Sequence, residues 1–294
     1  MKLESIKGYN PLWVGIGIFL ICNLFKDFEY LVIKTNETFL DDNTLNKVFG
    51  ILVIFIVLKI FNYTWRDIGF KKEKIWSGFI GGTLLGVVSF AITYTLEILY
   101  LSSNGVSTSL EFYSSGFSLT GSIVRNTEIS FIVLTFIVNL LNSWMEEGLF
   151  IGLFVKLFNK RYSIFIATII QSLLFGLWHV ILPIQSVVNG EMTISLGIIM
   201  SIGYVFIAFI MGAKWGLCTI YSGAIWVAFF NHMFNDLIQN LIHVVTPNAT
   251  DELEIIRIIF AQFLSLAFII IYGVYKKKNN TKKLDILVEK REEL

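Results

Sequence analysis

The chain has 294 residues, of which 55% are hydrophobic and 15% charged, and its mean hydropathy is +0.71. Soluble domains carry about 25% charged residues, so this composition excludes an ordinary soluble protein and indicates an integral membrane protein. The formal net charge of +1 offers no basic excess for a nucleic-acid partner.

The N-terminal segment is basic and then apolar, but it lacks a cleavage site of small residues. Further apolar segments follow it, so we expect a retained first helix and not a removed signal peptide. A hydrocarbon core about 30 Å thick needs roughly 20 apolar residues per helix. Stretches of this kind predict an all-α polytopic membrane protein with about eight transmembrane helices, at 11–25 (or to 33), 46–64, 75–99, 129–155, 161–183, 194–213, 215–243 and 254–275.

Positive charge predicts how these helices are oriented, because cytoplasmic loops are enriched in lysine and arginine. With eight spans and both termini inside, the basic loops near 66–74 and 156–161, Lys214 and the tail after 275 all lie on the cytoplasmic side. We therefore expect a multi-pass protein of the cell membrane with cytoplasmic N- and C-termini. Segment 101–127 becomes an outer loop with room for a short surface helix.

The third span carries a stripe of small residues, Gly78, Gly82 and Gly86. Such stripes let two helices approach closely, so they predict helix packing. The two cysteines, Cys22 and Cys218, lie in different predicted spans and share no motif with histidine. Neither a disulfide nor a thiolate zinc site is expected.

Five ionisable side chains fall well inside predicted spans: Glu146, Glu147, His179, His232 and Asp236. Each such group costs about 2.5 to 3.5 kcal/mol to insert, so these groups tend to pair, face inward and serve function. Counted along the helices from the basic inner flanks, Glu146, His179 and His232 lie at similar depths of roughly 21 to 27 Å. We therefore expect the five groups to find one another.

Helical spacing places these groups on polar stripes that line an interior cavity. The stripes are Asn139, Asn142, Ser143 and Glu146 in the fourth span, Gln171, Phe175 and His179 in the fifth, and His232 with Asp236 in the seventh, beside Asn231 and Asn235. Adjacent residues are about 100° apart on a helix, so Glu146 and Glu147 cannot both point at one atom. One can act on a substrate while the other orients a neighbour.

These side chains suit peptide hydrolysis. A glutamate in an apolar site can act as a general base toward water, and a nearby histidine can hold that water or protonate a leaving amine. A second histidine with an acidic or amide partner can donate to a developing oxyanion.

Three short motifs then indicate a family. "EEGLFI" at 146–151, "FGLWH" at 175–179 and "HMFND" at 232–236 occur in order on separate predicted helices. They resemble the motifs EExxxR, FxxxH and HxxxN or HxxxD of the CPBP group, which comprises CAAX prenyl proteases and bacteriocin-processing enzymes also called Abi proteins. The resemblance covers about residues 129–240 and implies an eight-helix intramembrane endopeptidase, with spans four to seven as its catalytic core.

The resemblance also implies roles for the five residues. Glu146 and His179 activate water, His232 and Asp236 bind the oxyanion, and Glu147 is a supporting carboxylate. Asp236 stands where asparagine is common, and as a carboxylate it orients His232 but repels an oxyanion unless protonated.

One position departs from the family pattern. Ile151 stands where the family has arginine, so Glu147 lacks its expected cation. The chain divides accordingly into 1–128 with three helices and the outer loop, 129–243 as the catalytic core, and 244–294 with the last helix and a basic tail.

Other interpretations stay open at this point. The two glutamates can mark a helix end at the interface, His179 can be a packed histidine, and His232 with Asp236 can be a structural hydrogen bond. His243 and Glu97 lie near helix ends, and we expect His243 at the surface or the membrane interface and Glu97 at the interface. No cofactor is expected, although two histidines with carboxylates are enough to bind zinc, so a glutamic-type and a metal-dependent peptidase both remain.

The leading hypothesis is an intramembrane endopeptidase that uses activated water to hydrolyse a peptide bond of a membrane-associated or lipidated peptide. Its expected partners are that peptide and the lipid bilayer, with no nucleic acid. The alternative is a non-catalytic membrane protein that binds a peptide, such as a bacteriocin immunity or secretion factor, and Ile151 is its best support. Cation or proton transport along the stripes is a third hypothesis, weakened by the lack of internal repeats.

Overall fold

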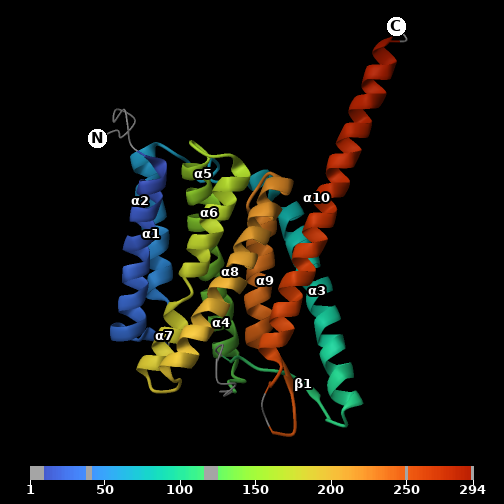
Figure 1. Ribbon diagram of the computed structural model, residues 1–294. Coiled ribbons are helices and arrows are strands. Elements are labelled where there is room, and N and C mark those ends of the chain that lie inside the picture. The colour runs from blue at the N-terminus through green and yellow to red at the C-terminus, as the bar shows by residue number, and fades with distance from the viewer. Residues whose placement is uncertain (1–9, 38–41, 116–124, 249–250, 293–294) are drawn as a thin grey trace.

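The computed structural model describes residues 10–37, 42–115, 125–248 and 251–292, with side chains to residue 278 in the last segment. Its helices run along one common direction and form a bundle (Figure 1). The α-helices are α1 (Pro11–Phe28), α2 (Leu45–Phe61), α3 (Ile75–Ser103), α4 (Ile129–Glu146), α5 (Val155–Phe158), α6 (Ile164–Leu177), α7 (Ile181–Val188), α8 (Ile194–Ser222), α9 (Trp226–Leu241) and α10 (Glu254–Glu292). Two π-helices, Glu29–Ile33 and Glu147–Phe154, two 3₁₀ turns, Thr35–Glu37 and Lys72–Lys74, and the strands β1 (Ser109–Phe112) and β2 (Ile242–Val245) complete the described elements.

The prediction of an all-α polytopic membrane protein is confirmed. Five helical segments are long and apolar enough to cross a membrane, at 72–103, 129–158, 164–188, 194–222 and 254–278. The count of eight spans is not confirmed, because α1, α2 and α9 have 18, 17 and 16 residues. Straight helices of that length reach about 24 to 27 Å, slightly less than a bilayer core.

The predicted boundary between the sixth and seventh spans is wrong. Helix α8 continues without a break through Lys214 and ends at Ser222, where Gly223 adopts a left-handed backbone with φ of 73°. Lys214 is buried, and its ammonium donates a hydrogen bond to Oε1 of Gln262 in α10 at 2.6 Å. Because this lysine finds its partner inside the bundle, it does not mark a loop.

Helices α3 and α9 pack closely along the predicted glycine stripe. A Cβ atom added to Gly78 would lie 2.2 Å from the Cβ of Trp226, and one added to Gly86 would lie 2.3 Å from the Phe234 ring. At Gly82 the contact is with backbone, because a Cβ there would lie 2.6 Å from the Val227 carbonyl oxygen. The stripe therefore positions α9, the helix that carries His232.

Gly82→Ala is expected to lower the free energy of unfolding by about 1 to 3 kcal/mol, because backbone atoms of α9 must move to admit the methyl group. The matched control is Gly81→Ala, whose Cβ would lie at an ordinary 3.6 Å from a methyl group of Val227. Denaturation in detergent micelles measures both. Equal stability of the two variants would contradict this account of the α3–α9 contact.

The outer loop holds a strand in its described part. β1 pairs with β2 in antiparallel register from Ser109 opposite Val245 to Phe112 opposite Ile242. The described residues of 101–127 include no surface helix, and 116–124 lie outside the described residues. The end of the predicted seventh span, at 242–243, belongs to β2.

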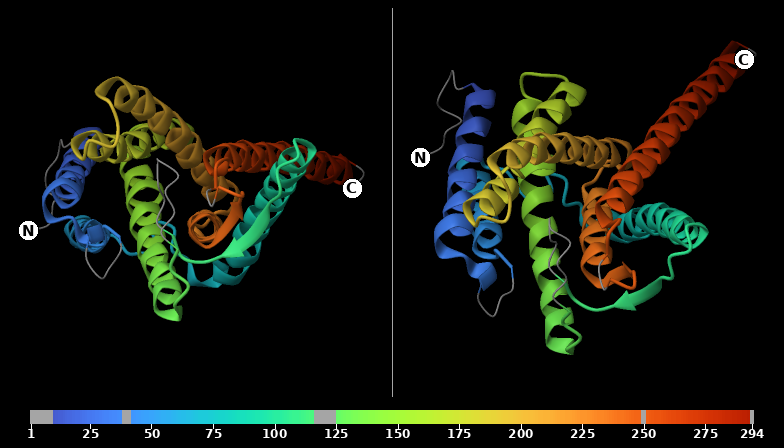
Figure 2. Two further views of the ribbon diagram at one scale, coloured as in Figure 1. Left: turned by 90° about the horizontal axis from the view of Figure 1, so that it is seen from below. Right: turned by 60° about the horizontal axis from the view of Figure 1, so that its bottom comes forward.

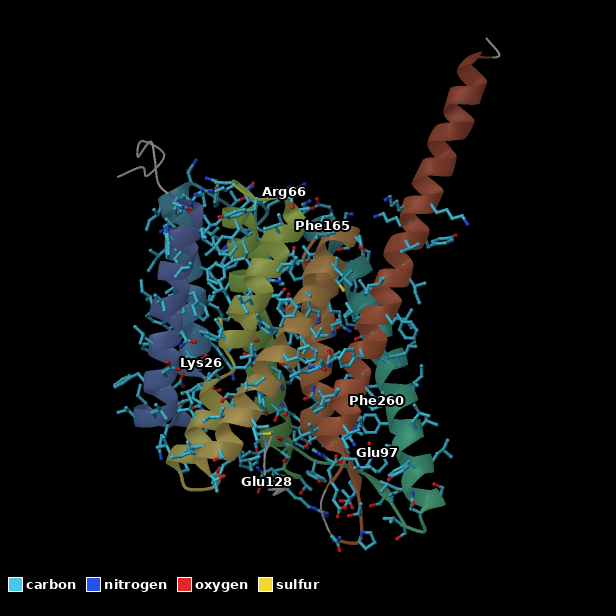
Figure 3. All side chains as sticks on the ribbon, in the orientation of Figure 1. Lys26, Arg66, Glu97, Glu128, Phe165 and Phe260 are labelled. Carbon is cyan, nitrogen blue, oxygen red and sulfur yellow. The ribbon has the colours of Figure 1, made fainter. Side chains whose placement is uncertain are left out.

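His243 and Glu97 are both buried within the protein, so His243 is not a surface residue. Arg257 explains both positions, since its guanidinium lies 2.6 Å from Oε2 of Glu97 and 2.6 Å from Oδ2 of Asp251. The His243 ring stacks on Tyr113 with 4.1 Å between ring centroids. Burial alone would raise the pKa of the Asp251 carboxyl, but hydrogen bonds with His243 and Arg257 hold it below its usual range. Figure 3 places Glu97 at the end of the bundle opposite Arg66.

Candidate active site

The two glutamates lie where α4 changes into the π-helix Glu147–Phe154. Seen from below, α4 lies between the α1–α2 pair and α9 (Figure 2). Glu146 is 4% exposed and Glu147 1%. The helical segment continues from 129 to 158, so the interpretation of the two glutamates as a helix end is wrong. π-helical turns are rare and occur frequently at functional sites.

His232 of α9 is the centre of a cluster of carboxylates. Its Nδ1 lies 2.9 Å from Oε1 of Glu147. Its Nε2 lies 3.6 Å from Oε2 of Glu146 and 3.4 Å from Oδ2 of Asp236. The structure thus brings together four of the five predicted residues, and the adjacent glutamates contact different nitrogens of one ring. Ionised carboxylates only accept hydrogen bonds, so this ring can donate from both nitrogens.

Aromatic side chains hold the His232 ring in place. Trp215 of α8 stacks on it with a centroid separation of 3.9 Å and an interplanar angle of 16°. The Trp215 indole donates to Oδ1 of Asn231 at 2.9 Å, which fixes the stacking ring in turn. Phe175 of α6 approaches the imidazole by its edge at 6.3 Å. The orientation of His232 is therefore set by α6, α8 and α9 together.

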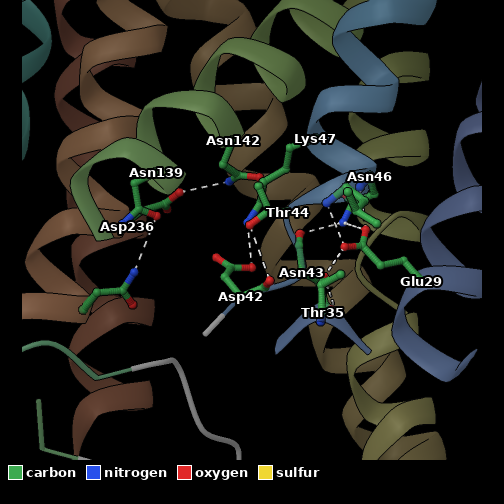
Figure 4. A network of polar contacts seen from close by, with 12 residues as sticks. Glu29, Thr35, Asp42, Asn43, Thr44, Asn46, Lys47, Asn139, Asn142 and Asp236 are labelled. Atoms are coloured by element: carbon green, nitrogen blue, oxygen red, sulfur yellow. Dashed lines mark hydrogen bonds and ion pairs between the residues drawn. The ribbon is translucent and has the colours of Figure 1, made fainter. Parts of the chain in front are cut away.

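Asp236 is held as an acceptor. Asn142 donates to its Oδ2 at 3.1 Å and Asn235 to its Oδ1 at 3.2 Å. Figure 4 draws Asn142 and Asp236 together with the polar cluster at the start of α2. The Asp236 side chain keeps 18% of its surface exposed, so one edge of the cluster is accessible. These contacts favour a carboxylate that orients His232 over one that binds an oxyanion.

His179 lies in the turn after α6, near the cluster but not bonded to it. Its Nδ1 faces the Phe175 carbonyl oxygen at 2.8 Å, so in the neutral ring Nδ1 carries the proton and Nε2 presents a lone pair. The Phe175 ring lies against His179 at 4.7 Å. The preceding residue, Trp178, donates its indole N–H to Oε1 of Glu146 at 2.8 Å. In the described part of the chain His179 makes no hydrogen bond with the carboxylates.

Residues 128–238 match the family model described as type II CAAX prenyl endopeptidase Rce1-like. This part of the chain is similar to that family. The match confirms the resemblance to the CPBP group, contains all five predicted site residues, and supports a CAAX-type intramembrane protease. A search of curated proteins found no match to the chain.

The matched segment departs from the first motif, EExxxR, at Ile151, and this affects the surroundings of Glu147. Ile151 is buried in the hydrophobic core. Glu147 pairs with His232 through Oε1, while its Oε2 is buried and has no hydrogen-bond partner among the described residues. The isoleucine therefore leaves one carboxylate oxygen without the cation that the motif supplies.

Two buried lysines near the site were not predicted from the sequence. Lys26 lies within α1, and its ammonium donates to the Trp178 carbonyl oxygen at 3.0 Å. Lys214 reaches Asp236 through a chain of amides, because Gln262 also donates to Oδ1 of Asn235 at 2.5 Å. The only sign of these residues in the sequence was a lysine inside an otherwise apolar stretch. Counting positive charges assigns such a lysine to a loop.

Among the described residues, no three side chains of His, Cys, Asp or Glu are arranged as a metal-binding group. Cys22 and Cys218 are buried free thiols.

Proposed function

We propose that the chain is an intramembrane endopeptidase that hydrolyses a peptide bond of a membrane-associated or lipidated peptide. The supporting observation is the buried cluster in which His232 contacts Glu146, Glu147 and Asp236, inside a segment that matches a CAAX prenyl endopeptidase family. Buried carboxylates are costly in a bilayer, so a site that keeps three of them serves a function.

Glu146 is the general base in this proposal. Trp178 occupies its Oε1, which leaves Oε2 to accept a proton from water. His179, with its Nε2 lone pair, holds that water on the other side. Glu146 then passes the proton to the leaving amine, as a general base becomes a general acid.

His232 supplies the donor for the oxyanion. Its Nε2 lies 3.4 Å or more from Asp236 and Glu146, beyond the usual N–H···O length of about 2.9 Å. The Nε2–H can therefore donate to an oxyanion without breaking a strong bond. Glu147 and Asp236 orient the ring, and no metal ion takes part.

His179→Ala is expected to slow cleavage about 10²- to 10⁴-fold, the usual contribution of a positioned acid or base. The purified protein in liposomes is incubated with a farnesylated peptide that ends in a CAAX sequence. The same peptide without the farnesyl group is tested in parallel. Mass spectrometry detects the released fragment. His243→Ala is the control, since it removes a buried histidine that lies near Asp251 and outside the cluster around His232. The chelator 1,10-phenanthroline is expected to leave the rate unchanged. Wild-type cleavage by the folded His179→Ala protein would refute the proposal.

A non-catalytic peptide-binding protein is the second candidate, favoured by the unpaired Oε2 of Glu147 beside Ile151. It predicts that the protein retains the farnesylated peptide without cleaving it. Retention that survives loss of both glutamates would support this candidate over proteolysis.

A further inference from the structure

Lys26 is a buried cation in α1, outside the segment that matches the family model. It is 4% exposed, and Figure 3 shows it within the bundle, away from the end where Arg66 lies. The end of α1 is fixed in the fold, because the following Glu29 carboxylate accepts from the backbone N–H of Leu45 at 2.8 Å, at the start of α2 (Figure 4). Lys26 therefore lies on a helix whose end is anchored to α2.

The Lys26 ammonium makes its closest contacts with Trp178, and it also lies 5.5 Å from the centroid of the Tyr30 ring. It donates to the Trp178 carbonyl oxygen at 3.0 Å and lies 4.2 Å from the centroid of the Trp178 ring. The indole N–H of that ring donates to Oε1 of Glu146 at 2.8 Å. A cation over an indole face is attracted to it, and it withdraws electron density from the N–H bond. Lys26 therefore strengthens the hydrogen bond that holds Glu146.

Lys26 also acts on Glu146 through space. Trp178 separates the ammonium from the Glu146 carboxylate, since its backbone carbonyl contacts one and its indole N–H the other. Effective dielectric constants in a buried site are far below that of water, so a cation one residue away matters there.

Lys26 adds a positive charge beside the three carboxylates that surround His232. The carboxylates of Glu146, Glu147 and Asp236 contribute three negative charges, and His232, Lys214 and Lys26 can contribute three positive charges, so three minus three leaves none. With an isoleucine at 151, removal of Lys26 leaves an excess of one buried negative charge. A bilayer opposes such an excess.

We propose that Lys26 is a positioning residue that holds Glu146 ionised and oriented through Trp178, and so supplies a positive charge to a site whose first motif lacks one. This inference rests on the proposed function, in which Glu146 is the general base. One part of it can be tested without a substrate, namely that the charge of Lys26 controls the protonation of Glu146.

Dicyclohexylcarbodiimide labelling tests that content without a substrate, because the reagent reacts with protonated carboxyl groups in apolar surroundings. The purified protein is labelled at neutral pH, and fragmentation mass spectrometry separates Glu146 from Glu147, with Glu97 as the internal standard. Lys26→Met and Lys26→Gln are expected to raise labelling of Glu146 about tenfold, the effect of losing one nearby opposite charge. Lys26→Arg is expected to label like the wild type.

Two controls separate charge from packing. Lys26→Gln keeps a donor for the Trp178 carbonyl but not the charge, so wild-type labelling in this variant would overturn the inference even if Lys26→Met unfolds. Lys214→Met is the matched control, since it removes another buried lysine that lies over a tryptophan, here Trp215 at 4.8 Å. It is expected to leave Glu146 labelling within about twofold, because Lys214 contacts Gln262 and Trp215 and not Trp178, the residue that binds Glu146.

Cleavage of the farnesylated peptide provides the second readout. Lys26→Gln is expected to lower kcat about tenfold with KM within about twofold, and Lys26→Arg to restore kcat. If no protein cleaves the peptide but Glu146 labelling follows the charge at 26, the proposed function fails and the inference stands. If the wild type cleaves and Lys26→Gln changes neither labelling nor kcat, the inference is overturned and the proposed function stands.

Discussion

Glu146→Gln is expected to lower kcat/KM for the farnesylated peptide by about 10²- to 10⁴-fold, the range found when a general base is removed. The amide has the shape of the carboxylate, and its oxygen can still accept the hydrogen bond from Trp178. It cannot accept a proton from water. Stability should therefore stay near that of the wild type while turnover is lost.

The matched comparison is Glu147→Gln, which changes the adjacent carboxylate. Glu147 contacts Nδ1 of His232 and orients the ring, so its amide is expected to reduce kcat less than Glu146→Gln does. Initial rates and thermal melting in the same detergent measure both variants. If Glu147→Gln were the more damaging change, the roles of the two glutamates would be reversed, and equal activity of all three proteins would remove the base from the proposal.

His232→Ala is expected to be the most damaging single substitution for stability and activity together. It leaves the carboxylates of Glu146, Glu147 and Asp236 without the ring that separates them, and breaking a buried ion pair in this way costs about 3 to 5 kcal/mol. Loss of the oxyanion donor adds a decrease in kcat of about 10²- to 10³-fold.

Chemical denaturation and single-turnover kinetics separate the two effects of His232→Ala. The double variant His232→Ala/Glu147→Leu removes one of the stranded charges as well. It is expected to recover part of the lost stability but none of the activity. If His232→Ala were as stable as the wild type, the three carboxylates could not all be ionised around this ring.

The meeting of the carboxylates with His232 could be predicted from the sequence, because helix periodicity and span length fix both face and depth. His232 and Asp236 share a face four residues apart, and Glu146 lies at similar depth on another helix. Their contacts in the structure follow from this. The close packing of α3 was predictable for the same reason, since Gly82 stands in a regular stripe.

The supporting partners could not be predicted in this way. Lys26 and Lys214 reach the site through Trp178, Gln262 and Asn235, which come from helices far apart in the sequence. Counting positive charges assigns each lysine to a loop, because the count depends on sequence position and gives no information about a partner on another helix. The π-helix after Glu146 was equally hidden, since an apolar run has the same hydropathy whether its hydrogen bonds span four residues or five.

The buried position of Ile151 changes how the first motif of this family should be searched for. A general base must occupy one place in the chain, but a counter-charge reaches it through space and can come from any helix that borders the site. In this protein it comes from α1, more than a hundred residues before the glutamates. An arginine missing from the motif is therefore no sign of a degenerate enzyme until every neighbouring helix has been searched for a lysine.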